Sequence, residues 1–135
     1  MIALDEKVRV AGQIAPSDLP AIAATGVTLI VNNRPDGEEF GQPTGADIET
    51  AARAIGLDYR YIPVAGGFSP DQVSAMAEAL DAAAGEALVF CRSGTRSAYL
   101  WALARAAQGV AGATLIVQAS AAGYDLSPLR NHLLR

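Results

Sequence analysis

Short runs of apolar and β-branched residues constrain the fold of this chain more than any other feature. Residues 27–31 (VTLIV) form one such run and residues 87–90 (ALVF) form another, and turn or helix signals flank both. Apolar runs of this length without alternation are typical of strands that are buried on both faces. Both runs therefore predict interior strands of a sheet that helices cover on both sides.

Helix-like segments separate the strand-like ones, and several of them end at a glycine. Strands are expected at 8–13, 27–31, 59–64 and 87–90, and helices at 16–25, 46–55, 70–84 and 97–107. Strands that alternate with helices of this length indicate βαβ units and a parallel sheet. The predicted fold is a three-layer α/β architecture, with a central parallel sheet of four to five strands flanked by helices.

The pattern of the C-terminal part allows two interpretations. Residues 114–117 (TLIV) would suit a fifth strand, but alanines on both sides favour a helix there, and residues 127–134 form a second short helical candidate. We expect helices in both places. At 135 residues the chain has the size of one domain, and residues 1–135 are predicted to form a single one.

Composition argues against several classes of protein. A net charge of −4 disfavours a nucleic-acid surface, and 51% hydrophobic residues disfavour disorder. No apolar run approaches the ~20 residues that a membrane-spanning helix needs, and acids stand where a signal peptide has basic residues. A single cysteine allows no internal disulfide, which suits a reducing compartment. We therefore expect a cytoplasmic protein that binds neither membrane nor nucleic acid.

The segment 91–97 (CRSGTRS) carries the strongest chemical signal. It follows the run at 87–90 and opens a helix, so Cys91 is expected at the carboxyl end of a strand, where ligands bind in parallel sheets. The helix start and the arginines Arg92 and Arg96 favour negative charge there, which promotes the nucleophilic thiolate of Cys91. The same groups would cradle an oxyanion such as phosphate, thiosulfate or sulfite. Besides the catalytic candidates Cys91 and Arg96, the predicted anion-binding residues are Arg92, Ser93, Gly94, Thr95 and Ser97.

The remaining candidates carry weaker signals. Arg34 follows a central strand and either contacts the anion or joins salt bridges with Asp36 and Glu38 in its own loop. Asp71 is the acid nearest to the strand at 59–64, but a role as a first-turn helix acid is favoured over a catalytic one. One cysteine and one histidine cannot form a zinc site, so no metal or cofactor is expected. A buried structural thiol is the alternative for Cys91, although its polar neighbours make a poor apolar core.

Three segments carry a resemblance to a known family, namely VTLIVNNRPDGEE at 27–39, DYRYIPV at 58–64 and VFCRSGTRSAYLW at 89–101. Together with the helices between them, about residues 4–107 resemble the phosphatase-like domain family of beta-lactamase hydrolase-like proteins. The resemblance implies a cysteine-phosphatase-like fold, in which strand, anion loop and helix are followed only by helices. Some members of this family are described as rhodanese-like sulfurtransferases and are found beside sulfur-oxidising enzymes.

The chain departs from the phosphatase pattern in three places. Phe90 replaces the histidine that precedes the nucleophile, four residues rather than five separate Cys91 from Arg96, and Ala65, Gly66 and Gly67 follow the strand where phosphatases hold a general acid. The CRSGTR segment also resembles the six-residue rhodanese loop, and expulsion of sulfite needs no acid. These departures predict a cysteine-dependent sulfurtransferase that moves sulfane sulfur from a donor to a thiol through a Cys91 persulfide.

Two alternatives stay open at this point. The first is a protein phosphatase of the tyrosine or dual-specificity type, which uses the same nucleophile through a Cys91 phosphocysteine. The second is a module without turnover of its own, which carries sulfur or serves as the partner of a sulfur-oxidising enzyme. The expected ligand is a small sulfur-containing anion or thiol, and a sulfur-oxidising enzyme is the predicted protein partner.

Overall fold

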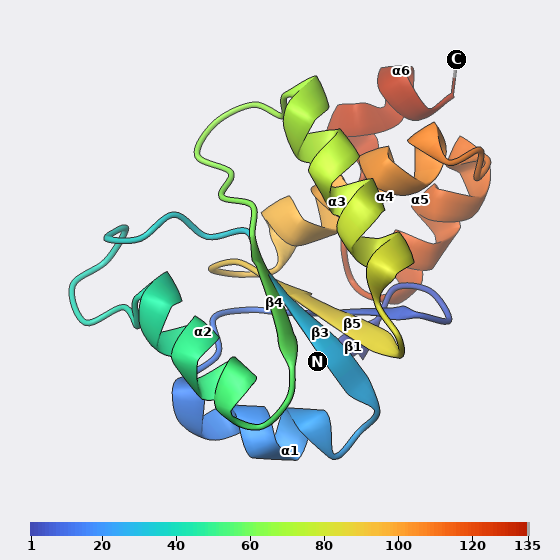
Figure 1. Cartoon of the computed structure of the whole chain (residues 1–135). Coiled ribbons are helices and arrows are strands. Elements are labelled where there is room, and N and C mark those ends of the chain that lie inside the picture. Colours follow the sequence, from blue (N-terminus) through green and yellow to red (C-terminus); the bar gives the residue numbers. More distant parts are fainter. Residues whose placement is uncertain (135) are drawn as a thin grey trace.

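The computed structural model describes residues 1–134 and shows three layers, with one sheet between two groups of helices (Figure 1). The strands are β1 (Ile2–Ala3), β2 (Val8–Ala11), β3 (Val27–Asn32), β4 (Asp58–Tyr61) and β5 (Glu86–Phe90). The α-helices are α1 (Leu19–Ala23), α2 (Gly45–Ala54), α3 (Pro70–Ala82), α4 (Thr95–Ala107), α5 (Gly112–Ala121) and α6 (Arg130–Leu133), and short 3-10 turns η1 (Pro16–Asp18) and η2 (Ser127–Leu129) precede α1 and α6. The predicted helix at 114–117 and the helical C-terminus are confirmed.

The sheet has the strand order β1-β2-β5-β3-β4, so β5 lies at its centre. The pairs β2–β5, β5–β3 and β3–β4 are parallel, whereas β1 joins the edge antiparallel to β2. The predicted parallel sheet is therefore confirmed, with one antiparallel edge strand that the sequence pattern did not predict. Two exposed residues are too short a segment to show any period.

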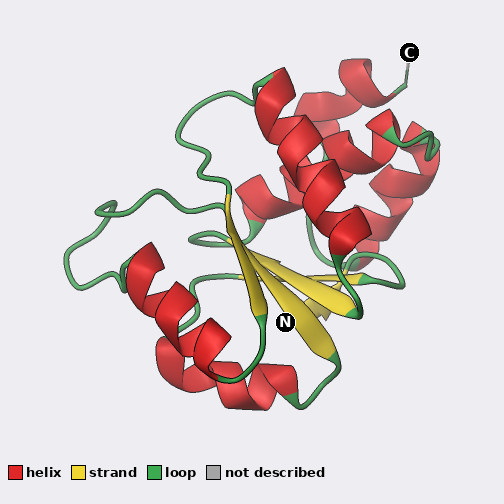
Figure 2. Ribbon diagram, viewed as in Figure 1, coloured by secondary structure: helices red, strands yellow, loops and turns green. Residues whose placement is uncertain are grey.

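Alternation along the central strands builds a separate core on each face of the sheet. On one side Ile30, Leu88 and Phe90 pack against α1 and α2, in a cluster that also holds Leu19 and Ile48. On the other side the cluster under α3, α4 and α5 consists of strand and helix residues that include Leu29, Val31, Val89, Met76, Leu80, Leu100, Trp101 and Leu115. Figure 2 shows the same division, with helices on both sides of the strands. Because strand side chains alternate between faces, unbroken apolar runs supply both cores.

Some boundaries differ from the predicted ones by a few residues. The ladder of β4 ends at Tyr61 rather than at 64, although the N–H groups of Ile62 and Val64 still donate to the carbonyls of Asn32 and Asn33 at 2.9 Å each. Pro63 lies between them and has no N–H, so the regular pattern stops while the segment still follows β3. Helix α4 begins at Thr95, two residues earlier than predicted.

The loops that follow β3, β4 and β5 leave the sheet at the same edge, on the left in Figure 1. This edge is the carboxyl end of the parallel strands, where open α/β sheets bind their ligands. Within residues 1–134, none of the helices has the length and apolar character that crossing a membrane would take.

Candidate active site

Cys91 lies directly after the central strand β5, with 1% of its surface exposed. Its sulfur Sγ accepts a hydrogen bond from the backbone N–H of Gly94 at 3.1 Å. Gly94 is the residue before α4, and it adopts φ +92, which L-residues seldom reach. This conformation turns the chain from the strand into the helix within a few residues, so the thiol lies at the helix N-terminus.

The first turn of α4 faces this thiol with free backbone donors. Among the residues that the structure describes, no side chain caps the helix, and the first helical N–H groups have no acceptor within the helix itself. The carbonyl of Arg92 accepts a hydrogen bond from the N–H of Gln13 at 3.1 Å, and the carbonyl of Gly94 accepts from the N–H of Ala98 at 2.8 Å. Because C=O and N–H of a trans peptide point in opposite directions, the N–H of Ser93 points away from Gln13, and the N–H of Thr95 points out of the N-terminal end of α4. Together with the Gly94 N–H, which donates to Cys91, these groups supply backbone donors at the loop.

Arg96 lies on the first turn of α4, and hydrogen bonds hold one end of its guanidinium group. Its Nη1 donates to the carbonyl of Val64 at 2.7 Å and to Glu38 at 2.8 Å, and its Nη2 donates to the other oxygen of Glu38 at 2.8 Å. Hydrogen bonds with Glu38, and in addition the negative charge of Cys91, raise the pKa of Arg96. The Nε–H and the second hydrogen of Nη2 take no part in these contacts. They form an edge of the guanidinium whose two parallel donors suit a bidentate contact with an oxyanion.

Two glutamates, Glu38 and Glu39, form ion pairs with three arginines near the loop. Arg34 is only 3% exposed, and it donates through Nε to Glu38 at 2.9 Å and through Nη2 to Glu39 at 3.0 Å. Arg92 pairs with the same oxygen of Glu39 at 2.9 Å. Hydrogen bonds from Arg96, and then from Arg34, lower the pKa of Glu38 from 4.5 to about 2. With three arginines and two carboxylates, this cluster keeps a net positive charge beside Cys91 at neutral pH.

A buried polar network ties the loop to the neighbouring strands. The hydroxyl of Ser97 donates to the side-chain oxygen of Asn33 at 2.8 Å, and the Asn33 amide donates to the carbonyl of Ile62 at 2.9 Å. The backbone N–H of Asn33 also donates to the carbonyl of Phe90, the residue before the thiol, at 2.8 Å. Asn33 therefore connects β3, β5, the segment after β4 and helix α4, and it fixes the position of Cys91 in the sheet.

The structure brings most of the predicted site residues together. Cys91, Gly94 and Arg96 lie around one cradle, and the exposed hydroxyls of Ser93 and Thr95 lie 3.2 Å from each other on its rim. The Arg92 side chain, in contrast, is 67% exposed and pairs with Glu39 outside the cradle. The hydroxyl of Ser97 turns to Asn33 instead, which leaves only the backbone N–H of Ser97 to face an anion.

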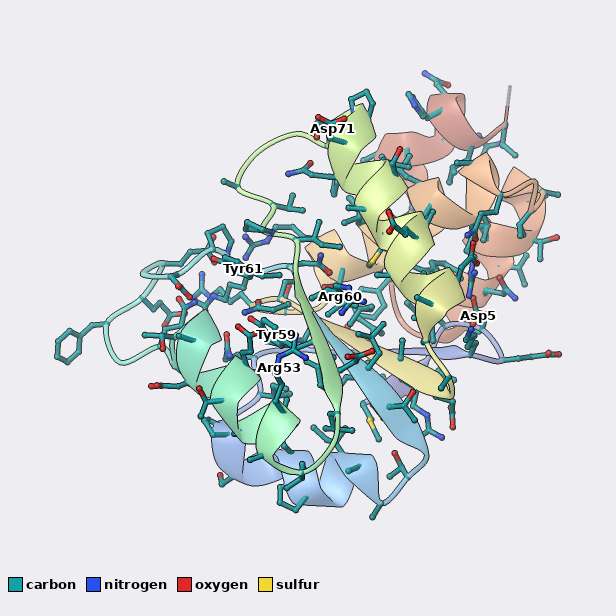
Figure 3. All side chains as sticks on the ribbon, in the orientation of Figure 1. Asp5, Arg53, Tyr59, Arg60, Tyr61 and Asp71 are labelled. Carbon is teal, nitrogen blue, oxygen red and sulfur yellow. The ribbon has the colours of Figure 1, made fainter. Side chains whose placement is uncertain are left out.

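Arg34 and Asp71 are placed differently from the loop residues. All three nitrogens of the Arg34 guanidinium contact Gln13, Glu38 or Glu39. The expected salt bridge of Arg34 with Glu38 is present, but Glu39 is the second carboxylate partner. Asp36, which was expected in that place, accepts a hydrogen bond from the N–H of Gly45 instead. Asp71 is exposed in the first turn of α3, and Figure 3 shows it at the N-terminal tip of that helix. The position of Asp71 fits the favoured role of a first-turn helix acid, whereas contact of Arg34 with an anion stays a prediction.

The sequence comparisons identify one family. The matching family model is that of the beta-lactamase hydrolase-like protein, phosphatase-like domain, and it covers residues 1–108. A beta-lactamase hydrolase-like protein of Agrobacterium fabrum is 37% identical over 109 residues, which is 80% of this chain and 25% of that protein. A protein of the same name from Xylella fastidiosa is 34% identical over 110 residues, or 81% of this chain and 26% of that protein. The chain thus spans about a quarter of the length of these curated relatives.

Solved structures agree with this match. A candidate phosphatase of Neisseria meningitidis is 33% identical, with a TM-score of 0.84 over 98% of this chain and 94% of that one. Kinase associated phosphatase, solved with its catalytic-site cysteine replaced by serine, is 14% identical, with a TM-score of 0.67 over 93% of this chain and 86% of that one. At this lower identity the likeness shows the fold alone, and it confirms the predicted cysteine-phosphatase-like architecture.

These findings overturn the predicted sulfurtransferase activity, which is wrong, because the family model and the structural relatives are phosphatase-like. The loop length misled the prediction, since four intervening residues still place Arg96 in the first turn of α4 with its charge near Cys91. Phe90 misled it as well, because this side chain is fully buried in the core beneath α1 and α2, where it fills space. The chain belongs to the phosphatase-like domain family of the beta-lactamase hydrolase-like proteins.

Proposed function

We propose that this chain is a cysteine-dependent phosphatase that hydrolyses phosphate monoesters through a phosphocysteine at Cys91. The observation that carries the proposal is the backbone cradle, in which the N–H of Gly94 donates to the thiol and the guanidinium of Arg96 lies close enough for the charge of Cys91 to raise its pKa. A phosphoryl group matches this arrangement because it offers three equatorial oxygens to donors while its phosphorus faces the sulfur. The membership of the chain in a phosphatase-like family supports the same chemistry.

In the first step the Cys91 thiolate attacks phosphorus, an S–P bond forms, and the P–O bond to the leaving group breaks. The electron pair of that bond departs on the leaving oxygen. Backbone N–H groups of the loop and the Nε and Nη2 of Arg96 hold the equatorial oxygens as charge develops on them. Positive charge at the helix N-terminus and on Arg96 also stabilises the thiolate before attack.

In the second step a water molecule attacks the phosphorus of the phosphocysteine. The S–P bond breaks, the electron pair returns to sulfur as thiolate, and one proton of the water is released to solvent or to the phosphate product. Splitting one displacement into two easier ones is the general advantage of a covalent intermediate.

The leaving group sets the substrate class that we propose. The segment after Val64 reads Ala65, Gly66 and Gly67, so it carries no acid to protonate a departing alkoxide. Phenolates leave readily without a proton, whereas alkoxides do not. Aryl phosphates and phosphotyrosine are therefore the proposed substrates, ahead of phosphoserine or phosphothreonine.

Rapid quenching with an aryl phosphate tests the proposal. We expect steady release of phosphate and, in the quenched protein, a mass increase of one phosphoryl group on Cys91. Cys91→Ser should abolish both signals while unfolding at the wild-type temperature, because the change is small and lies at the loop. Phosphate release that survives in Cys91→Ser would remove this cysteine from the mechanism.

Two further expectations stay predictions, because neither the fold nor the relatives bear on them. They are the sulfur-oxidising partner enzyme and the cytoplasmic location.

A further inference from the structure

We propose that Tyr124 is a positioning residue for the Cys91 loop, which it orients through the Ser93–Gly94 peptide. The Tyr124 hydroxyl donates to the carbonyl of Ser93 at 3.1 Å, and the N–H on the other side of that same peptide donates to Cys91 Sγ at 3.1 Å. One trans peptide thus bridges the hydroxyl and the thiol. The inference rests on the proposed function only in taking this loop as the binding site of a phosphoryl oxyanion.

The orientation of this peptide decides what the thiol faces. If the peptide turned over, the Ser93 carbonyl oxygen would point at Cys91 in place of the Gly94 N–H. A partial negative charge would then oppose both the thiolate and any bound oxyanion. Gly94 has the backbone freedom for such a turn, because glycine reaches conformations that other residues avoid. The phenol hydroxyl holds the carbonyl on the outer side of the loop and so stabilises the donor orientation.

Packing brings the hydroxyl to this position. A Cβ built on Gly94 would overlap the Tyr124 hydroxyl, and it would lie 3.1 Å from Cγ2 of Val10. Because Gly94 has no side chain, the Tyr124 hydroxyl occupies the space that a Cβ of this residue would fill. Burial, and in addition the charge of Cys91, raises the pKa of Tyr124 above 10.0, so the phenol stays a neutral hydrogen-bond donor.

The segment that carries Tyr124 is itself fixed. Its backbone N–H donates to the carbonyl of Ala119 at 2.8 Å, which closes the end of α5. The hydroxyl of Tyr99, on α4, donates to the carbonyl of Asp125 at 3.0 Å. Tyr124 lies beyond residue 108, where the match to the family model ends, so a segment outside that match completes the outer wall of the loop.

Direct binding of tungstate by calorimetry tests this role without requiring turnover. Tyr124→Phe removes only the hydroxyl, and Tyr99→Phe is a matched control that removes an equivalent hydroxyl-to-carbonyl bond in the same region. We expect Tyr124→Phe to bind tungstate about five-fold more weakly than the wild type, because the net loss of one hydrogen bond lowers a binding constant by about this factor. Tyr99→Phe should bind it like the wild type. Both variants should unfold at similar temperatures, because each loses one comparable bond.

The other outcomes overturn the inference. Equal tungstate affinity in Tyr124→Phe and the wild type would mean that the hydroxyl does not orient the loop. An equal loss in both variants would assign the effect to docking of the turn at 123–125, and no binding by the wild type would remove the oxyanion site itself. Failure of the proposed function is distinct, since it would appear as tungstate binding by a wild-type protein that releases no phosphate from an aryl phosphate.

Discussion

Two loops meet at the carboxyl edge of the sheet, and different kinds of contact hold them. The Cys91 loop is held through its own backbone, because successive carbonyls accept hydrogen bonds from Gln13 and Tyr124. The loop at 34–39 is held through charged side chains, since Glu38 and Glu39 pair with three arginines. Neutral hydrogen bonds respond little to salt and pH, whereas ion pairs are weakened by salt to the extent that they are exposed and are lost when the carboxylate is protonated.

The two kinds of contact have different roles in this site, because backbone contacts set its geometry and charged side chains set its electrostatic field. The donors that face Cys91 keep their directions through backbone contacts with residues far away in the sequence. The electrostatic field around them depends on the pairing between Arg34, Arg96 and Glu38, which substitutions or pH can change. Changes to the backbone loop should therefore have larger effects on anion binding than changes to the charged loop.

Gly94→Ala should have the largest effect. The added Cβ would meet the Tyr124 hydroxyl at a φ of +92, so the loop must move and Gly94 N–H loses its direction toward Cys91. We expect kcat/KM on an aryl phosphate to fall by about 100-fold, the scale of losing one oxyanion donor. Strain at this φ should also lower the free energy of unfolding by about 1–2 kcal/mol, measured by urea denaturation.

Gly109→Ala separates strain from loop geometry. Gly109 has a φ of +95, nearly that of Gly94, but no atom of residues 1–134 lies within 4 Å of its added Cβ. This variant should lose about the same stability of 1–2 kcal/mol and keep its activity. Equal activity of the two variants would contradict the view that the backbone of the Cys91 loop determines anion binding.

The comparison also explains how far the sequence could lead. The apolar runs at 27–31 and 87–90 predicted the interior strands, and the position of Cys91 after one of them predicted the cradle, because these signals are local. Contacts such as Tyr124 with Ser93, or Glu38 with Arg96, join residues 31 and 58 positions apart. No periodicity along the chain encodes such pairs, so only the folded chain shows them.

The error about the reaction has a different origin. The prediction relied on missing features, namely a histidine before Cys91 and an acid after Val64, and the lack of these residues leaves the Cys91 loop and its Gly94 hydrogen bond in place. The pairing of Arg34 with Glu38 was foreseen as a loop salt bridge, yet its link onward to Arg96 was not. A local salt bridge in the sequence thus proved to be part of a longer network.

Glu38→Gln should have the second largest effect, and its sign follows from the pKa. Hydrogen bonds from Arg96 lower the pKa of Glu38 from 4.5 to about 2 in the folded protein, so the ionised form is favoured by folding. The stabilisation is fully present above pH 4.5 and is lost as the pH falls through about 2. The wild type should therefore lose stability relative to Glu38→Gln between these pH values, in urea denaturation at pH 7, 4 and 2.5.

Steady-state kinetics of the Glu38→Gln variant test a second consequence of the same change. With Glu38 neutral, the far end of Arg96 keeps only Val64 as a firm partner, so KM for an aryl phosphate should rise several-fold. Glu49→Gln is the matched control, because Glu49 pairs at 2.9 Å with Arg53 on the remote helix α2. Tighter substrate binding in Glu38→Gln would show that this carboxylate competes with the phosphoryl group instead of orienting Arg96.

Arg92→Gln should have the smallest effect, because the Arg92 side chain is 67% exposed and its ion pair with Glu39 lies in solvent. Such pairs contribute at most about 1 kcal/mol, and Glu39 keeps its bond to the buried Arg34. We expect an unchanged unfolding midpoint and a KM that rises no more than about two-fold at low salt, a difference that should vanish near 0.5 M salt through screening. Steady-state kinetics at several salt concentrations measure this. A salt-independent loss of kcat/KM as large as that of Gly94→Ala would place Arg92 inside the cradle. It would also contradict the distinction between a Cys91 loop whose backbone sets the geometry of the site and a charged loop at 34–39 that adjusts its electrostatic field.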